Sequence, residues 1–191
     1  MIKSIDSEIP FHKDKYFVDT NVWFWFTYCA SKEIELKTAP RRYQLEKYPD
    51  FVEKVLDSGA KIYHCPLVYA ELANIIERTE FEIYIAKNPT LKKTRKEFRA
   101  DSECRQLVIN EIRMAWDTIN TISNSLDFSL SNKIVEGVHA VIENSTLDPY
   151  DSFYCYLMGY VGINKIITDD ADFNSVDGTE LYTANRKVLS H

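Results

Sequence analysis

The sequence predicts an α/β fold with a central parallel sheet that carries helices on its faces. Short apolar runs typical of strands alternate with longer segments of helical periodicity, an order that favours parallel strands joined by helices. Acidic residues directly follow several of these runs, at the sheet edge where open α/β folds bind ligands. With 191 residues, of which 45% are hydrophobic, the chain suits one domain with a substantial core.

The first half of the chain contains two predicted strand–helix units. Pro40 is expected to open the second helix, Pro49 to divide or kink it, and Gly59 to end it in the C′ position that favours glycine. Pro66 stands just after the second strand and is typical of the first turn of a helix. The predicted elements are a strand at 15–19, a helix at 21–30, a helix at 41–58, a strand at 61–64 and a helix at 66–87.

The middle of the chain departs from this alternation. Residues 87–100 hold six basic side chains against one acid, and they lead into a helix with apolar residues four and three apart. We therefore expect a helical insertion at about 87–130 within a single domain of residues 1–191. The apolar stripe suits a partner helix, in a homodimer or in a complex with another protein, as well as the protein's own core. It comprises Val108, Ile112, Ala115, Ile119, Ile122 and Leu126.

The C-terminal part returns to the α/β alternation. A helix is expected near 132–143, and Asp148 and Pro149 form the N-cap and first position of the next one. Short strands at 165–168 and 181–183 complete the predicted sheet.

Composition limits the classes of function. The net charge of −6 excludes a surface that attracts nucleic acid as a whole, so binding a polyanion requires a local basic patch. Four widely spaced cysteines without a CxxC pair indicate reduced thiols rather than disulfides or a zinc site. Because no 18-residue apolar run or signal-peptide core occurs, we expect a soluble, cytoplasmic protein without a membrane segment.

Four acidic positions recur at the predicted carboxyl edge of the sheet. Carboxylates gathered there repel one another unless a cation neutralises them, and their oxygens suit Mg²⁺ or Mn²⁺. Such a site implies phosphodiester chemistry. The four are Asp19 after the first strand, Glu71 beside the apolar stripe of the long helix, Asp151 in a helical first turn, and Asp170 after the strand at 165–168.

Three of these positions also have an interpretation without a metal. Asp19 is equally well placed to cap the helix that follows it. Glu71 has the alternatives of reaching solvent or pairing with Arg78. Asp151 stands at N3 of its helix, where a carboxylate favours the helix dipole with or without an ion.

The acids after the strand at 165–168 exceed what a turn needs. Three of them fall within four residues. We expect Asp170, and next Asp172, to face a cation and Asp169 to face solvent.

The motifs DTNVW, YAEL, YDSFYCYLMGYVG and IITDDADF, in this order, resemble the acidic signatures of the PIN-domain nucleases. That family includes the VapC-type toxins of bacterial toxin–antitoxin pairs, so the resemblance makes an antitoxin protein one possible partner for the apolar stripe. The resemblance implies a three-layer α/β/α fold, one or two Mg²⁺ or Mn²⁺ ions, and single-stranded RNA as substrate. It assigns metal binding and catalysis to Asp19, Glu71, Asp151 and Asp170, with Asp172 as an auxiliary ligand. Thr20, Asn21 and Thr168 are then expected to orient the carboxylates.

A metal-activated water is the nucleophile that this arrangement predicts, so the products would carry 5′-phosphate and 3′-hydroxyl ends. Phosphate contacts supply most of the affinity for RNA. We therefore expect the basic run to bind the RNA backbone. An equally good interpretation is that these side chains form a solvated surface without a partner. The residues concerned are Lys92, Lys93, Arg95, Lys96 and Arg99.

Two other functions are compatible with parts of the sequence. A non-catalytic module that binds RNA or a protein partner would keep the fold, but the presence of all four acids argues against a decayed site. A phosphatase that forms an aspartyl-phosphate at Asp19 would need a second acid two residues on, where this chain has Asn21. A metal-dependent endoribonuclease, of toxin type, is the function that the sequence favours.

Overall fold

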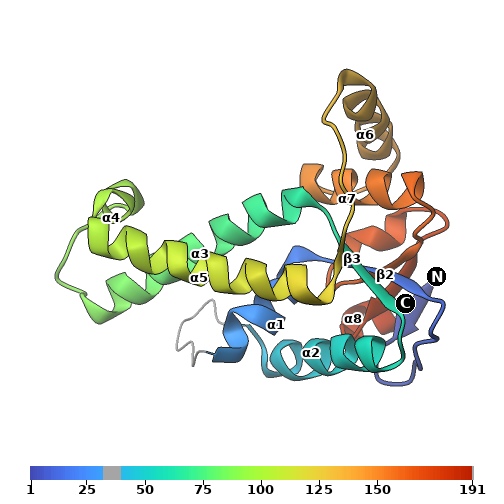
Figure 1. Ribbon diagram of the computed structural model, residues 1–191, viewed down its shortest axis with the longest axis horizontal. Helices are drawn as coiled ribbons and strands as arrows, with labels where there is room; N and C mark the ends of the chain where they lie inside the picture. The colour runs from blue at the N-terminus through green and yellow to red at the C-terminus, as the bar shows by residue number, and fades with distance from the viewer. Residues whose placement is uncertain (32–39, 191) are drawn as a thin grey trace.

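The computed structural model of the protein describes residues 1–31 and 40–190. Its centre is a six-stranded sheet in the order β1-β6-β5-β2-β3-β4, in which every pair of neighbours is parallel (Figure 1). The parallel α/β architecture is therefore confirmed. The strands are β1 (Ile2–Ser4), β2 (Lys15–Val18), β3 (Lys61–His64), β4 (Asn124–Ser125), β5 (Lys165–Ile167) and β6 (Glu180–Thr183).

Helices surround this sheet, and α3, α4 and α5 extend away from it as an arm with α4 at its far end (Figure 1). We call these three helices the arm. The helices are α1 (Thr20–Thr27), α2 (Arg42–Asp57), α3 (Pro66–Lys87), α4 (Arg95–Ala100), α5 (Ser102–Ile122), α6 (Asn132–Asn144), α7 (Pro149–Tyr160) and α8 (Arg186–Leu189), with 3₁₀ turns η1 (Cys29–Ser31) and η2 (Asp172–Ser175).

The two faces of the sheet are covered by different helices. Consecutive strand residues point to opposite faces, and β2 shows this directly. The ring of Tyr16 lies 6.1 Å from that of Phe51 on α2, whereas the ring of Phe17 lies 5.3 Å from that of Tyr154 on α7. The sheet is thus the middle of three layers, with α2 and α7 on opposite sides.

The chain order creates a ligand-binding position at the end of β2. The chain runs from β2 to β3 on one side, and the later strand β5 returns to the other side of β2. Such a switch in direction opens a crevice at the carboxyl end of the central strand. Asp19 is the first residue after β2, so it stands at this crevice.

The second predicted helix differs from expectation at both prolines. It begins at Arg42, with Arg41 as its N-cap, rather than at Pro40, and it is one continuous helix with Pro49 inside it. Of the two predicted effects of Pro49, a division of the helix is therefore wrong, and the buried residues on either side, Tyr48 and Phe51, hold both halves against the sheet. Gly59 has φ +77° one residue after the C-cap, as the sequence predicts.

The apolar stripe of α5 is used inside the chain. Val108, Ile112, Ala115 and Ile119 are all buried, and α5 packs against α1 and α3. Of the two interpretations, packing on the protein's own core is therefore the one that the structure shows. Two short edge strands, β1 and β4, were not predicted, since three and two residues are too few to show a period.

None of the described helices has the length and apolar character needed to cross a membrane. All four cysteines are free, as their spacing predicts.

Candidate metal centre

Asp19 is held at the crevice by the neighbouring strand. Its backbone N–H donates to the carbonyl of Ile167 on β5 at 3.1 Å, and its Oδ2 accepts a hydrogen bond of 2.7 Å from the hydroxyl of Thr168. The side chain is 3% exposed and forms no capping bond to α1, although it occupies the N-cap position. The carboxylate is therefore oriented toward β5 rather than used to cap the helix.

Glu71 meets the same crevice from α3. Its Oε2 accepts hydrogen bonds from the hydroxyl of Thr20 at 2.6 Å and from that of Tyr154 at 2.7 Å. The two hydroxyls are 3.1 Å apart. One carboxylate oxygen thus joins α1, α3 and α7. No ion pair with Arg78 is formed, so that alternative is excluded.

Asp151 lies in the first turn of α7 and is buried. Asp148 is the N-cap, and its Oδ1 accepts a hydrogen bond of 3.0 Å from the N–H of Asp151, which confirms the predicted capping role. Because Asp148 serves the backbone, the side chain of Asp151 remains available to the crevice.

The loop after β5 holds the remaining acids. The N–H of Asp170 donates to the hydroxyl of Thr168 at 3.0 Å, and Asp170 in turn accepts from the N–H of Asp172 at 2.8 Å. Asp170 is half-buried, whereas Asp172 is exposed on η2. Thr168 therefore contacts both Asp19 and the segment that carries Asp170.

Asp169 does not face solvent as expected. Its carboxylate accepts hydrogen bonds from Tyr43 at 2.9 Å, Gln44 at 2.7 Å and Tyr48 at 2.6 Å. These donors all come from α2, so Asp169 ties the start of that helix to the loop after β5. The expectation was wrong because the partners lie far away in the sequence.

The acids at the crevice influence one another electrostatically. Burial, and then the charge of Glu71, raise the pKa of Asp19. Burial, and then the charge of Asp19, raise the pKa of Asp151, to which Asp170 and Glu71 also contribute. The pKa of Asp170 is raised mainly by burial. Among the described residues, no lysine, arginine or histidine forms an ion pair with any of the four.

This donor set fits a hard divalent cation. All the candidate ligands are carboxylate oxygens, which Mg²⁺ and Mn²⁺ prefer, and their mutual repulsion is not relieved by a cationic side chain. Within residues 1–31 and 40–190, no three acidic, histidine or cysteine side chains already surround one point as a ready-made ion site.

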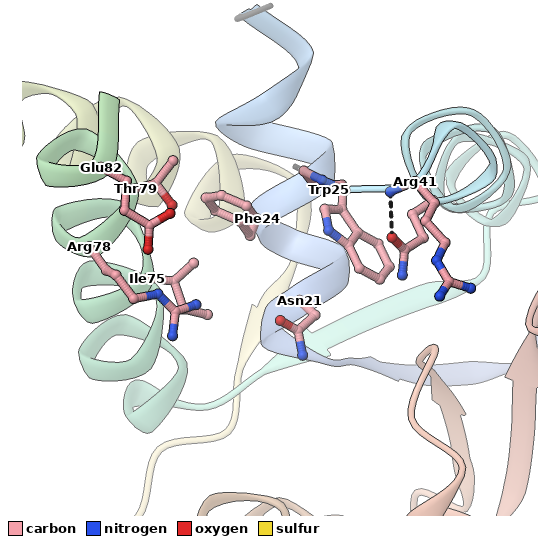
Figure 2. Close-up of a pocket in the computed structure, with 10 residues that line it drawn as sticks. Asn21, Phe24, Trp25, Arg41, Ile75, Arg78, Thr79 and Glu82 are labelled. Atoms are coloured by element: carbon pink, nitrogen blue, oxygen red, sulfur yellow. Dashed lines mark hydrogen bonds between the residues drawn. The ribbon is translucent and has the colours of Figure 1, made fainter. Parts of the chain in front are cut away.

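A polar cavity of about 510 Å³ adjoins this centre between α1, α3 and the start of α2 (Figure 2). Asn21, two residues after Asp19, lines its floor, and the guanidinium groups of Arg41 and Arg78 stand on opposite sides of it in Figure 2. Asn21 therefore faces the cavity, and no hydrogen bond joins its side chain to a carboxylate among the described residues.

The basic run at 92–99 lies on the arm, around α4, away from the sheet (Figure 1). Arg95 and Arg99 both bind Glu77, and Lys93 binds Asp101 at 2.9 Å. Lys92 and Lys96 have no acidic partner among the described residues. Three of the five predicted RNA-binding side chains are thus engaged within the arm.

Sequence reasoning assigned no role to Tyr154, the second donor to Glu71. One signal was available, because Tyr154 follows Asp151 by three residues and therefore shares its helix face. Tyrosines in apolar helices are usually core residues, and Tyr154 is itself fully buried, so its hydroxyl role follows only from the contact with α3.

Comparisons with known proteins agree with this architecture. The sequence model of the PIN domain family matches residues 16–179. The fold is similar to a chain in the crystal structure of VapBC2 from Rickettsia felis bound to a DNA fragment from their promoter, with 13% identity, a TM-score of 0.50, and coverage of 88% of this chain and 98% of that chain. No sequence among curated proteins matches.

A parallel α/β sheet with acids at the carboxyl ends of its central strands is an architecture that suits a hydrolase. The chain belongs to the PIN-domain family, the nuclease family that its acidic motifs resemble.

Proposed function

We propose that this protein is a divalent-metal-dependent endoribonuclease that hydrolyses phosphodiester bonds of single-stranded RNA. The observation that carries the proposal is the meeting of acids from four separate segments at the end of β2, without a cationic partner among the described residues. A structural cluster would be neutralised by lysine or arginine, because buried charges without partners are costly.

Asp19, Glu71, Asp151 and Asp170 are the residues that would hold the ion, with Asp172 beside them as an auxiliary. Bound Mg²⁺ or Mn²⁺ would supply a water of lowered pKa and stabilise charge on the phosphate.

The surrounding hydroxyls orient these carboxylates. Thr168 fixes Asp19 toward the crevice, while Thr20 and Tyr154 hold one oxygen of Glu71 and leave the other available. Such supporting donors set the orientation of a ligand, and their loss typically reduces metal affinity or activity about 10–100-fold. Asn21 lies at the cavity beside the centre, where it is placed to contact substrate.

A toxin-type role with an inhibitory protein partner extends this proposal. Its support is the resemblance of the acidic motifs to VapC-type toxins, together with the fold shared with the VapBC2 chain. Expression in a bacterial host should arrest growth, and the Asp19→Asn variant should not. Equal growth arrest by both forms would contradict the role.

Cleavage of a single-stranded RNA oligonucleotide with Mn²⁺ tests the nuclease directly. Asp19→Asn and Asp151→Asn should each lower the rate by about a hundredfold or more, because each removes a charged ligand. Asp117→Asn, an exposed acid on α5, is the matched control and should cleave like the parent.

The product ends give the second readout. We expect 5′-phosphate and 3′-hydroxyl ends, since water attacks the phosphorus. Undiminished cleavage by both variants, or 2′,3′-cyclic phosphate ends, would refute the proposed mechanism.

A further inference from the structure

An acidic centre that acts on RNA must overcome its repulsion of the phosphate backbone. Cations therefore have to lie close to it. The arm does not provide them, because α4 is remote from the sheet and Arg95 and Arg99 are held by Glu77 (Figure 1).

A second cavity, of about 240 Å³, lies at the carboxyl end of β6. Four of its lining residues are basic: Arg41, Lys47, Arg186 and Lys187. No acidic residue lines it among the described residues. Lys47 forms an ion pair with Asp6, but no described acid pairs with the other three. We call Arg41, Arg186 and Lys187 the basic triplet; all three are exposed.

The wall of this cavity is tied to the acidic loop. Tyr43, which lines it, donates to the carboxylate of Asp169 at 2.9 Å, and the side-chain amide of Asn185 donates to the carbonyl of Asp169 at 2.9 Å. Asp170 is the next residue in the chain. These hydrogen bonds hold the backbone segments that carry the basic triplet against the loop that carries Asp170.

Charge alternates along the carboxyl edge of the sheet. The cations at the end of β6 come first, followed by the acids at the ends of β5 and β2, because these three strands are neighbours. Arg41 lines both this cavity and the larger one that holds Asn21 and Arg78 (Figure 2). The basic triplet thus lies on the β6 side of the acids, and Arg78 lies on α3, the helix that carries Glu71, in a cavity that Glu82 also lines.

We propose that the basic triplet binds backbone phosphates of the single-stranded RNA on one side of the bond to be cleaved, and that Arg78 binds a phosphate on the other side. This proposal rests on the ribonuclease function. Guanidinium groups suit it because they present a fork of donors to phosphate oxygens. The contacts carry no base information, so the affinity they provide should be independent of sequence.

The test measures the affinity of the Asp19→Asn protein for a single-stranded RNA oligonucleotide at several salt concentrations, in EDTA, so that cleavage does not interfere. Adding Arg41→Gln, Arg186→Gln and Lys187→Gln should raise the Kd at least tenfold at low salt. The slope of log K against log[salt] should become shallower by about 2, since each lost contact to a single strand contributes about 0.7.

A control variant removes the same charge elsewhere. Lys92→Gln, Lys96→Gln and Arg113→Gln replace three exposed cations of the arm and should leave the slope unchanged. A slope that falls equally in both triple variants would overturn the proposal, because net charge alone would then explain binding. An unchanged slope in the basic-triplet variant would overturn it as well. All six side chains are exposed, and circular dichroism checks that each variant is folded.

The single substitution Arg78→Gln tests the second half of the proposal independently. It should make the slope shallower by about 0.7, and adding it to the basic-triplet variant should give the sum of the two changes. An unchanged slope in Arg78→Gln would remove Arg78 from the RNA path.

Failure of this inference differs from failure of the nuclease proposal. If the parent cleaves RNA but the basic-triplet variant binds RNA with an unchanged salt slope, the nuclease proposal stands and the RNA contacts lie elsewhere on the protein. Salt-dependent binding through the basic triplet without cleavage by the parent would instead indicate a non-catalytic RNA-binding module.

Discussion

Helix α3 carries two glutamates in opposite electrostatic surroundings. Glu77, on the arm, is 6% exposed and is bound by Arg95, Arg99 and Arg105. Glu71, six residues earlier and at the sheet edge, accepts hydrogen bonds from hydroxyl groups alone among the described residues, and it lies near other carboxylates. The chain therefore has arginines available for a buried carboxylate, and it places them on the arm.

The two surroundings have opposite consequences for stability. Hydrogen bonds from Arg99, and then Arg95, lower the pKa of Glu77, so its charged form stabilises the fold. At the crevice, burial and neighbouring acids raise the pKa of Asp19 and Asp151, so their charged forms destabilise the fold. The first cluster therefore stabilises the fold, whereas the second costs stability unless a cation neutralises it, which is what the proposed function supplies.

The largest expected effect on stability comes from Glu77→Gln. Three guanidinium groups would lose their shared partner. Because these groups are partly exposed, we expect the free energy of unfolding to fall by about 1–3 kcal/mol, which is less than the full cost of breaking a buried pair. Urea unfolding measures it. Glu71→Gln, measured without divalent ions, is the control on the same helix and should not lower stability, because it removes a charge that repels Asp19. Equal losses would remove the contrast between the two sites.

Asp19→Asn should act in the opposite direction. Without divalent ions, removing a buried charge that repels Glu71 should raise the free energy of unfolding by about 1–2 kcal/mol, which shifts Tm by about 2–4 °C per kcal/mol. Adding Mn²⁺ should raise the Tm of the parent and leave that of the variant nearly unchanged. A variant less stable than the parent in EDTA would show that the charge is already compensated.

Acid pH should separate the contribution of Glu77 from the rest of the fold. Because its folded-state pKa is lowered, its contribution is fully present above the unfolded-state value of about 4.3 and is lost as the pH falls through the folded-state pKa. The difference in unfolding free energy between the parent and Glu77→Gln should therefore shrink below about pH 4. A constant difference down to pH 3 would mean that packing, not charge, dominates at this site.

The smallest effect is expected from Tyr154→Phe. Glu71 keeps the hydroxyl of Thr20, so we expect a loss of about 1 kcal/mol in stability. Calorimetric titration should show a decrease in Mn²⁺ affinity of about tenfold, because the carboxylate is less firmly oriented. The two measurements separate the contribution of the hydroxyl to stability from its contribution to metal binding. A Tyr154→Phe protein that loses stability but keeps its Mn²⁺ affinity would assign Tyr154 to the core alone.

The sequence by itself determined the alternation of the long helices with strands β2, β3, β5 and β6, the acids that follow β2 and β5, and local features such as the Asp148 cap and the turn at Gly59. These depend on contacts within a few residues, which periodicity, capping and glycine conformation express directly.

Only the tertiary structure decided which charges meet. Glu77 takes up Arg95 and Arg99, Asp169 binds the start of α2, and Arg41 joins Arg186 in one cavity, although these partners lie far apart in the sequence. A charged side chain carries no local pattern that names its partner. Folding brings such residues together through the packing of the elements that carry them, and that packing is set by the apolar core rather than by the charges.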